Sequence, residues 1–156
     1  MKKYFIVAGE PSGDLHGSKL IKAIKHLNPN SSFMGHGGDS MRNEGMHIIE
    51  HVDSLAIMGF AEVLRHLPRM NKIMRNTVGA IERSKPDRVI LIDYPGFNLR
   101  LAKRLSPLKI PITYFILPQA WAWKQRRVEV LKRFIDQSIS IFPFEYDWYK
   151  KHGLRV

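Results

Sequence analysis

The sequence predicts an α/β protein with a doubly wound, parallel, Rossmann-like sheet, and three observations carry that prediction. Short apolar runs typical of strands alternate along all 156 residues with helical patterns, which favours parallel strands joined by crossover helices. Residues 88–92 form a nearly continuous apolar run, as expected of a central strand covered on both faces. Residues 4–8, another apolar run, pass through a glycine-rich turn into an amphipathic helix, which is how open α/β sheets present ligand sites.

The glycine-rich turn at residues 9–17 is the segment around which we expect a site to form. Ser12 is a suitable N-cap, and Asp14 suits a first helical turn, where the helix dipole favours negative charge. The glycine spacing is neither that of a dinucleotide fingerprint nor that of a P-loop, and the carboxylates of Glu10 and Asp14 oppose phosphate binding there. The turn therefore either grips hydroxyl groups or neighbouring loops, or is a tight turn before a capped helix.

The remaining elements follow from hydrophobic periodicity and turn residues. We expect strands at residues 4–8, 32–35, 47–50, 88–93, 110–117 and 137–142. We expect helices at residues 14–27, 40–44, 125–134 and 144–152, one ending near residue 105, and helical structure within 54–84 that Pro68 divides in two.

Two strand ends carry candidate chemistry. Asp93 ends the buried strand, where partial desolvation would raise its pKa and suit it to proton abstraction; the plainer role is a turn or cap residue. Gln119, Trp121 and Trp123 follow the strand at 110–117 and could form an apolar wall with a polar handle for a sugar or acyl group, although core packing would also explain the tryptophans.

Residues 54–78 combine large apolar side chains, among them Leu64, Leu67, Ile73 and Met74, with five interleaved basic residues. This pattern is typical of an interfacial or partner-binding helix, and also of an ordinary surface helix packed on a sheet.

Composition narrows the classes of function. Twenty-five lysines and arginines against 14 acidic residues give a formal charge of +11, which suits nucleic acid, an anionic membrane surface or a phosphorylated substrate. We expect no nucleic-acid partner, since no recognition motif is present. With no cysteine and no paired-histidine motif, we expect no metal and no cofactor. Neither a signal peptide nor a membrane-spanning run is visible, which favours the cytoplasm.

Seven motifs, taken together in this order and spacing, resemble the amino-terminal half of the lipid-A-disaccharide synthases, which are glycosyltransferases of the two-domain GT-B type. The motifs are residues 9–17, 33–38 with Met41, 55–60 with Glu62-Val63, 85–87, 92–98, 118–123 and 142–145. The resemblance covers the whole chain.

The resemblance implies an inverting transfer in lipid A (lipopolysaccharide) biosynthesis. UDP-2,3-diacylglucosamine is joined to 2,3-diacylglucosamine 1-phosphate, with release of UDP, on the inner face of the cytoplasmic membrane. We therefore expect residues 1–156 to be the acceptor-side domain, to lack the carboxyl-terminal nucleotide-sugar domain, and to be inactive alone. A homodimer of the full-length form is a further expectation.

The resemblance also suggests roles for individual residues. Asp93 is the candidate base, and His16 is a second candidate because neutral imidazole can do the same work. The other residues fall into three groups: loop residues at the domain cleft (Glu10, Ser12, Gly13, Asp14), acceptor-binding residues (Asn98, Gln119, Trp121, Trp123) and membrane-surface residues (Leu64, Leu67, Ile73, Met74). The competing interpretation is a non-catalytic, membrane-surface lipid-binding module.

Overall fold

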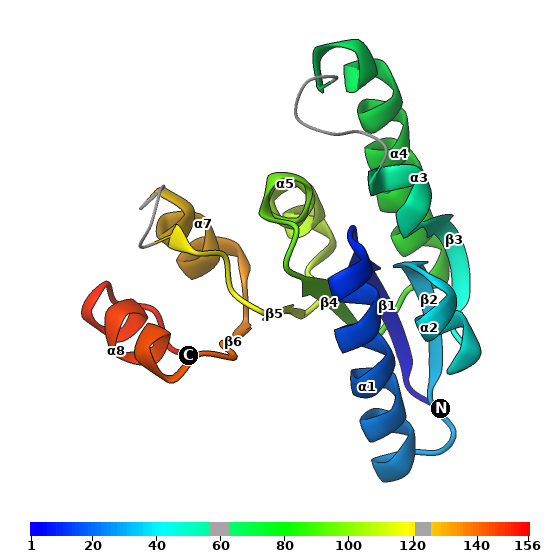
Figure 1. The fold of residues 1–156 in the computed structure, drawn as a ribbon, viewed down its shortest axis with the longest axis horizontal. Coiled ribbons are helices and arrows are strands. Elements are labelled where there is room, and N and C mark those ends of the chain that lie inside the picture. The colour runs from blue at the N-terminus through cyan, green and yellow to red at the C-terminus, as the bar shows by residue number, and fades with distance from the viewer. Residues whose placement is uncertain (57–62, 121–125) are drawn as a thin grey trace.

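The described residues form a six-stranded parallel sheet flanked by helices, which confirms the predicted fold class. The structure is a computed structural model and describes residues 1–56, 63–120 and 126–156 (Figure 1). The strands are β1 (Lys3–Ala8), β2 (Ser32–Gly37), β3 (His47–His51), β4 (Arg88–Ile92), β5 (Ile112–Phe115) and β6 (Gln137–Ile139). Their order, β3-β2-β1-β4-β5-β6, is that of a Rossmann-like sheet.

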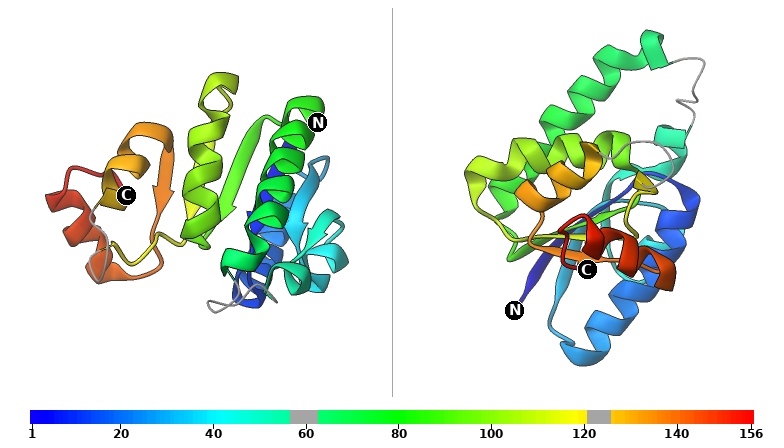
Figure 2. Two further views of the ribbon diagram at one scale, coloured as in Figure 1. Left: turned by 90° about the horizontal axis from the view of Figure 1, so that it is seen from above. Right: turned by 90° about the vertical axis from the view of Figure 1, so that its left-hand side faces the viewer.

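Helices cover both faces of the sheet. They are α1 (Pro11–Leu27), α2 (Asp39–Asn43), α3 (Val52–Ala56), α4 (Val63–Ser84), α5 (Pro95–Leu105), the 3₁₀ turn η2 (Ser106–Leu108), α7 (Arg126–Phe134) and α8 (Pro143–Lys151). The right-hand view of Figure 2 places α4 and α5 above the sheet and α1 below it.

The alternation of side chains along β1 explains these two layers. Phe5 and Val7 belong to one core cluster with residues of α4, α5 and α7, and Ile6 and Ala8 belong to a second cluster with Ile21 of α1. All four β1 side chains are fully buried, as expected for a central parallel strand.

Two details of the predicted helices are wrong. Helix α1 begins at Pro11, and Ser12 is not its N-cap; Glu10 takes that position with extended backbone and no side-chain capping bond, because proline supplies a favourable first residue. Helix α4 continues through Pro68 and is not divided there. Pro68 lies near the amino-terminal end of α4 as described, where it removes one intrahelical hydrogen bond without a break.

The prediction that Ile73 and Met74 face a membrane is also wrong. Their side chains are 6% and 1% exposed and belong to the core beneath α4. The apolar stripe of α4 packs on the sheet, as a crossover helix requires. Leu67, by contrast, is 41% exposed, and the side chain of Leu64 lies outside the described part of the chain.

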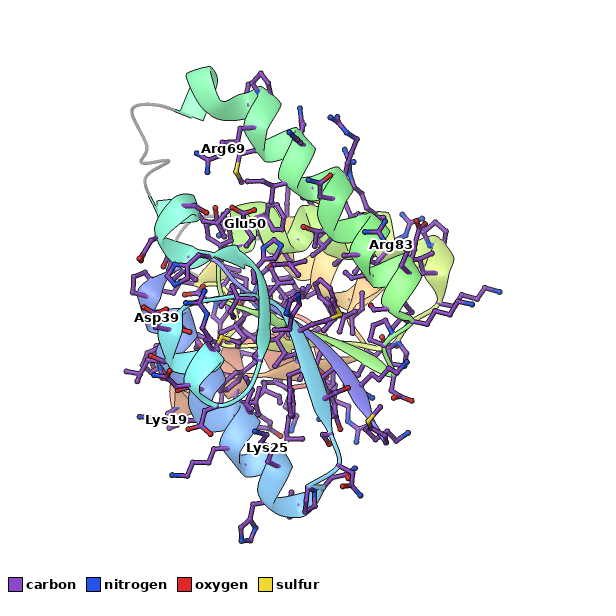
Figure 3. The ribbon with its side chains drawn as sticks, turned by 90° about the vertical axis from the view of Figure 1, so that its right-hand side faces the viewer. Lys19, Lys25, Asp39, Glu50, Arg69 and Arg83 are labelled. Atoms are coloured by element: carbon purple, nitrogen blue, oxygen red, sulfur yellow. The ribbon has the colours of Figure 1, made fainter. Side chains whose placement is uncertain are left out.

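The outer face of α4 is basic, with Arg69, Lys72 and Arg75 all exposed. Figure 3 labels Arg69 and Arg83 towards the two ends of this helix, and Figure 1 shows its amino-terminal turns projecting beyond the sheet. None of the helices in the described segments has the length and apolar character needed to cross a bilayer.

Candidate active site at the carboxyl ends of the strands

The site lies where the sheet changes winding direction. β1 is paired with β4 at the centre of the sheet, with Ala8 opposite Ile92, so that the turns beginning at Gly9 and Asp93 start side by side. The chain leaves β1 towards one side of the sheet and β4 towards the other, which opens a crevice between the two turns.

A cavity of about 480 Å³ occupies this crevice and brings together five residues singled out in the sequence. These are Ser12, Gly13, His16, Asp93 and Gln119. The rest of the described lining comes from the start of α5, the segment after β5, α7 and the segment before α8: Pro95, Ile116, Leu117, Pro118, Arg127, Ile141 and Phe142. Both candidate bases therefore border one cavity, and their catalytic roles remain predictions.

The backbone at the Asp93 turn is strained. Asp93 and Tyr94 have φ angles of 45° and 48°, in the left-handed region that costs a non-glycine residue roughly 1–2 kcal/mol. Strain of this kind persists where surrounding contacts fix it, and it concentrates at functional sites.

Hydrogen bonds fix the Asp93 backbone on both sides. Its N–H donates to the carbonyl of Phe115 at 3.0 Å. Its carbonyl accepts from the Tyr114 hydroxyl at 2.6 Å and from the Asn98 side-chain amide at 2.8 Å.

The ring of Tyr94 links this turn to the glycine-rich turn after β1. A Cβ atom on Gly9 would lie 2.2 Å from Tyr94 Cδ1, so the ring packs directly over the glycine backbone. Residue 9 must therefore lack a side chain for the two turns to meet in this way.

The surroundings of Asp93 raise the pKa of its carboxyl above the ordinary value. Burial is the largest cause, the charge of Glu10 adds to it, and the N–H of Tyr94 and the Arg127 guanidinium act against it. A carboxylate with a raised pKa is a stronger base at neutral pH while still ionised, which suits proton abstraction.

His16 approaches the same cavity from α1. Its ring is partly buried and meets the Phe115 ring edge-on, with centroids 6.3 Å apart. His16 and Asp93 line the same cavity, so His16 stays a candidate for the base.

Asp14, expected to face the cleft, instead clamps a neighbouring loop. The side chain is 6% exposed, and its carboxylate accepts from the backbone N–H groups of Gly38, Ser40 and Met41 at 2.7, 3.0 and 3.0 Å. These amides lie at the amino-terminal end of α2, where a carboxylate satisfies otherwise unpaired donors. Asp14 is therefore corrected from a substrate-binding to a positioning residue; the expectation that the turn grips a neighbouring loop is confirmed.

Asn98 is also turned away from any ligand. It is fully buried, and its amide nitrogen lies 2.8–3.3 Å from the carbonyl oxygens of Val7, Ile92 and Asp93. The prediction that it binds sugar hydroxyls is wrong, because helix α5 starts directly over the strand ends and encloses the side chain.

The remaining predicted residues have mixed outcomes. Gln119 lines the cavity, whereas Glu10 is exposed and is not among the described lining residues. Trp121 and Trp123 lie outside the described residues, so their predicted role stands untested. No three histidine, aspartate or glutamate side chains in the described ranges are grouped as metal ligands would be.

Sequence reasoning missed Arg127 and Tyr114. Arg127 lies in the first turn of α7. The first turns of crossover helices lie at the carboxyl edge of a parallel sheet, and this position could have indicated Arg127 as a site residue. Tyr114 is a tyrosine in a buried strand, where its hydroxyl needs an internal partner.

Comparison with known proteins places the chain in a family. The family model described as lipid-A-disaccharide synthetase matches residues 4–156. The chain belongs to this family. A lipid-A-disaccharide synthase of Acidobacterium capsulatum is 43% identical over 153 residues, and one of Myxococcus xanthus is 39% identical over 152 residues. Each alignment covers 97% of the chain but 38% and 40% of the relative, so this member of the family spans about 40% of the length of these relatives.

Solved structures support the fold. UDP-GlcNAc 2-epimerase from Neisseria meningitidis, bound to UDP-GlcNAc, superposes with a TM-score of 0.67 at 12% identity. A putative UDP-N-acetylglucosamine 2-epimerase from Listeria monocytogenes gives 0.66 at 10% identity. Both superpositions cover 99% of this family member and 44% and 43% of the other chain, respectively.

The Asp14 clamp predicts a large effect on stability. Asp14→Ala should lower the free energy of unfolding by roughly 3–5 kcal/mol, because two buried amides and one partly buried amide lose a charged acceptor. Asp14→Asn should cost less, since the amide oxygen can still accept from Gly38 and Met41 in place of Oδ1. Urea denaturation measures both.

The control is Asp53→Ala, at a carboxylate that is 79% exposed and paired only loosely with His51. It should change stability by less than about 0.5 kcal/mol. Equal effects at Asp14 and Asp53 would contradict the clamp.

Proposed function

We propose that this chain is the acceptor-side domain of an inverting glycosyltransferase of lipid A biosynthesis. The transfer joins UDP-2,3-diacylglucosamine to 2,3-diacylglucosamine 1-phosphate, forms the β-1′,6-linked disaccharide and releases UDP. Membership of the lipid-A-disaccharide synthetase family supports the reaction class. The observation that carries the proposal is Asp93: a half-buried carboxyl with a raised pKa that lines a cavity at the winding switch of the sheet.

Asp93 acts as the general base in this proposal. As the acceptor 6-hydroxyl oxygen bonds to C1 of the donor sugar, the Asp93 carboxylate takes the hydroxyl proton. The bond between C1 and the UDP oxygen breaks on the opposite face, and configuration at C1 inverts. His16 is the alternative base, because it lines the same cavity.

The other cavity residues supply binding. Among the described lining residues Arg127 is the one arginine or lysine, and its guanidinium suits the phosphate of the acceptor. Gln119 offers both a donor and an acceptor for sugar hydroxyls. Trp121 and Trp123 remain our predicted acceptor wall. We propose that residues beyond this chain bind the nucleotide, and that residues 1–156 alone form no product.

A basic, partly apolar surface on α4 suits work at a membrane. Arg69, Lys72 and Arg75 are exposed beside Leu67, and both proposed substrates carry acyl chains. Each lysine or arginine near an anionic bilayer contributes about 1 kcal/mol of attraction. We therefore propose peripheral association with the inner face of the cytoplasmic membrane; the same surface also supports the second candidate, a non-catalytic lipid-binding module.

The test uses a protein that joins this chain to the residues proposed to bind the nucleotide, which we call the longer protein. Asp93→Asn in the longer protein should lower disaccharide formation by roughly 10²–10⁴-fold, the usual contribution of a general base. The rate is measured as the disaccharide formed when both lipid substrates are supplied.

The Asp93→Asn variant should also be more stable than the unmodified protein at neutral pH. Because the folded-state pKa of Asp93 is raised, its stabilising contribution is present at low pH and is lost as pH rises through that pKa.

Asp147→Asn, at an exposed position on α8, is the matched control and should leave rate and stability unchanged. Full activity of Asp93→Asn, with loss of activity in His16→Gln, would transfer the role of base to His16. If the unmodified longer protein binds vesicles but forms no disaccharide, the lipid-binding module is the better account.

If the exposed basic face of α4 binds the membrane, removing charges there should weaken vesicle binding more than removing the same charge elsewhere. Lys72→Gln with Arg75→Gln should weaken co-sedimentation with vesicles of phosphatidylglycerol in phosphatidylcholine by about thirtyfold, the equivalent of two lost charges. Lys19→Gln with Lys22→Gln removes the same charge from the exposed side of α1, on the other face of the sheet (Figure 3), and should weaken it far less. Equal losses in the two pairs would show a general charge effect and no membrane face on α4.

A further inference from the structure

We infer that Tyr114 and Asn98 are positioning residues for Asp93: they hold its backbone in the left-handed conformation from which its carboxyl borders the cavity. The inference rests on the proposed role of Asp93 as the base. Neither residue lines the described cavity, so both would act through Asp93 and not on the substrate.

Both side chains donate to the carbonyl oxygen of Asp93, one from a strand and the other from a helix. The Tyr114 hydroxyl comes from β5, the neighbouring strand, at 2.6 Å, and the Asn98 amide comes from the first turns of α5 at 2.8 Å. Both side chains are fully buried. The Asn98 amide nitrogen also lies 3.3 Å from the carbonyls of Val7 and Ile92, which ties the ends of β1 and β4 to the same point.

This arrangement makes the strained conformation the favoured one. Relaxing Asp93 to an ordinary backbone angle would rotate its carbonyl away, which would leave the buried Tyr114 hydroxyl without its acceptor and remove the shortest of the three contacts of the Asn98 amide. Leaving a buried donor unpaired is costly. The next residue strengthens the lock, because the carbonyl of Tyr94 accepts from the N–H groups of Phe97 and Asn98 at 3.3 and 3.0 Å.

Loss of the Tyr114 or Asn98 donor should therefore change the position of the Asp93 carboxyl and leave substrate binding largely unchanged. With the Tyr114 hydroxyl removed, the Asp93 turn can relax and the carboxyl can move from the cavity wall towards solvent. Small misplacements of a catalytic group reduce the rate strongly while contacts made by other residues persist.

The test is Tyr114→Phe in the longer protein, assayed for disaccharide formation. The value of kcat should fall by roughly ten- to a hundredfold, with KM for both lipid substrates changed less than about twofold. The acid limb of the pH–rate profile should move to lower pH, because a more solvated carboxyl loses part of the burial that raises its pKa.

The matched control is Tyr4→Phe, which removes the same atom from a tyrosine at the opposite end of β1, where the ring stacks on Phe33 at 5.4 Å. It should leave kcat and the acid limb unchanged. Asn98→Ser, which withdraws the second donor, should act in the same direction as Tyr114→Phe. Thermal unfolding of each variant shows that the measured protein is folded.

Unchanged kcat and an unmoved acid limb in Tyr114→Phe and Asn98→Ser would overturn the inference. A lower kcat with an unmoved acid limb would also overturn it, since loss of stability alone gives that result. Asp93→Asn in the same assay separates the proposed base from the proposed positioning residues. If Asp93→Asn stays active, the proposed base is wrong. If Asp93→Asn is inactive and Tyr114→Phe is normal, only the positioning role is wrong.

Discussion

The pairing of β1 with β4 at the centre of the sheet is the constraint on which the site depends. It sets Ala8 beside Ile92, so that the glycine-rich turn and the Asp93 turn must leave the sheet together and then diverge. The bare backbone of Gly9 lets the Tyr94 ring bridge these turns, and Asn98 of α5 joins the ends of both strands. The cavity is thus a consequence of strand order, and its chemistry comes from the residues that the order brings together.

Two carboxylates near the cavity, Asp14 and Asp93, have different surroundings and therefore different roles. Asp14 is almost fully enclosed but is satisfied by three backbone amides, so its task is to fix one loop against another. Asp93 is half-buried near the charge of Glu10 and faces the cavity, so its ionised form is less well stabilised. The first carboxylate holds the site together, and the second supplies the reactivity that we propose.

Much of the fold could be predicted from the sequence, because periodicity and turn residues are local signals. These signals indicate the order of strands and helices and the buried run before Asp93. The meeting of Asp93 with Ser12, Gly13 and His16 follows from one further rule, that parallel strands end at a common edge. The failures at the candidate site and on α4 concern the direction of side chains. Asn98 and Asp14 are residue types that often bind ligands, yet backbone groups of other segments bind the Asn98 amide nitrogen and the Asp14 carboxylate, and no local pattern reveals those partners. The same ambiguity applies to Ile73 and Met74, whose helical stripe fits a core as well as a membrane. Arg127 was missed although the first turn of a crossover helix lies at the carboxyl edge of the sheet.

The most direct test of this account is a pH titration of the Asp93 carboxyl group. NMR follows the chemical shift of its carboxyl carbon, and the signal is assigned by its absence in Asp93→Asn. A carboxyl held half-buried at the meeting point of the two turns should titrate above its ordinary value of 3.8, and Glu10→Gln should lower its midpoint. A midpoint at or below 3.8 that does not respond to Glu10 would contradict the arrangement described here.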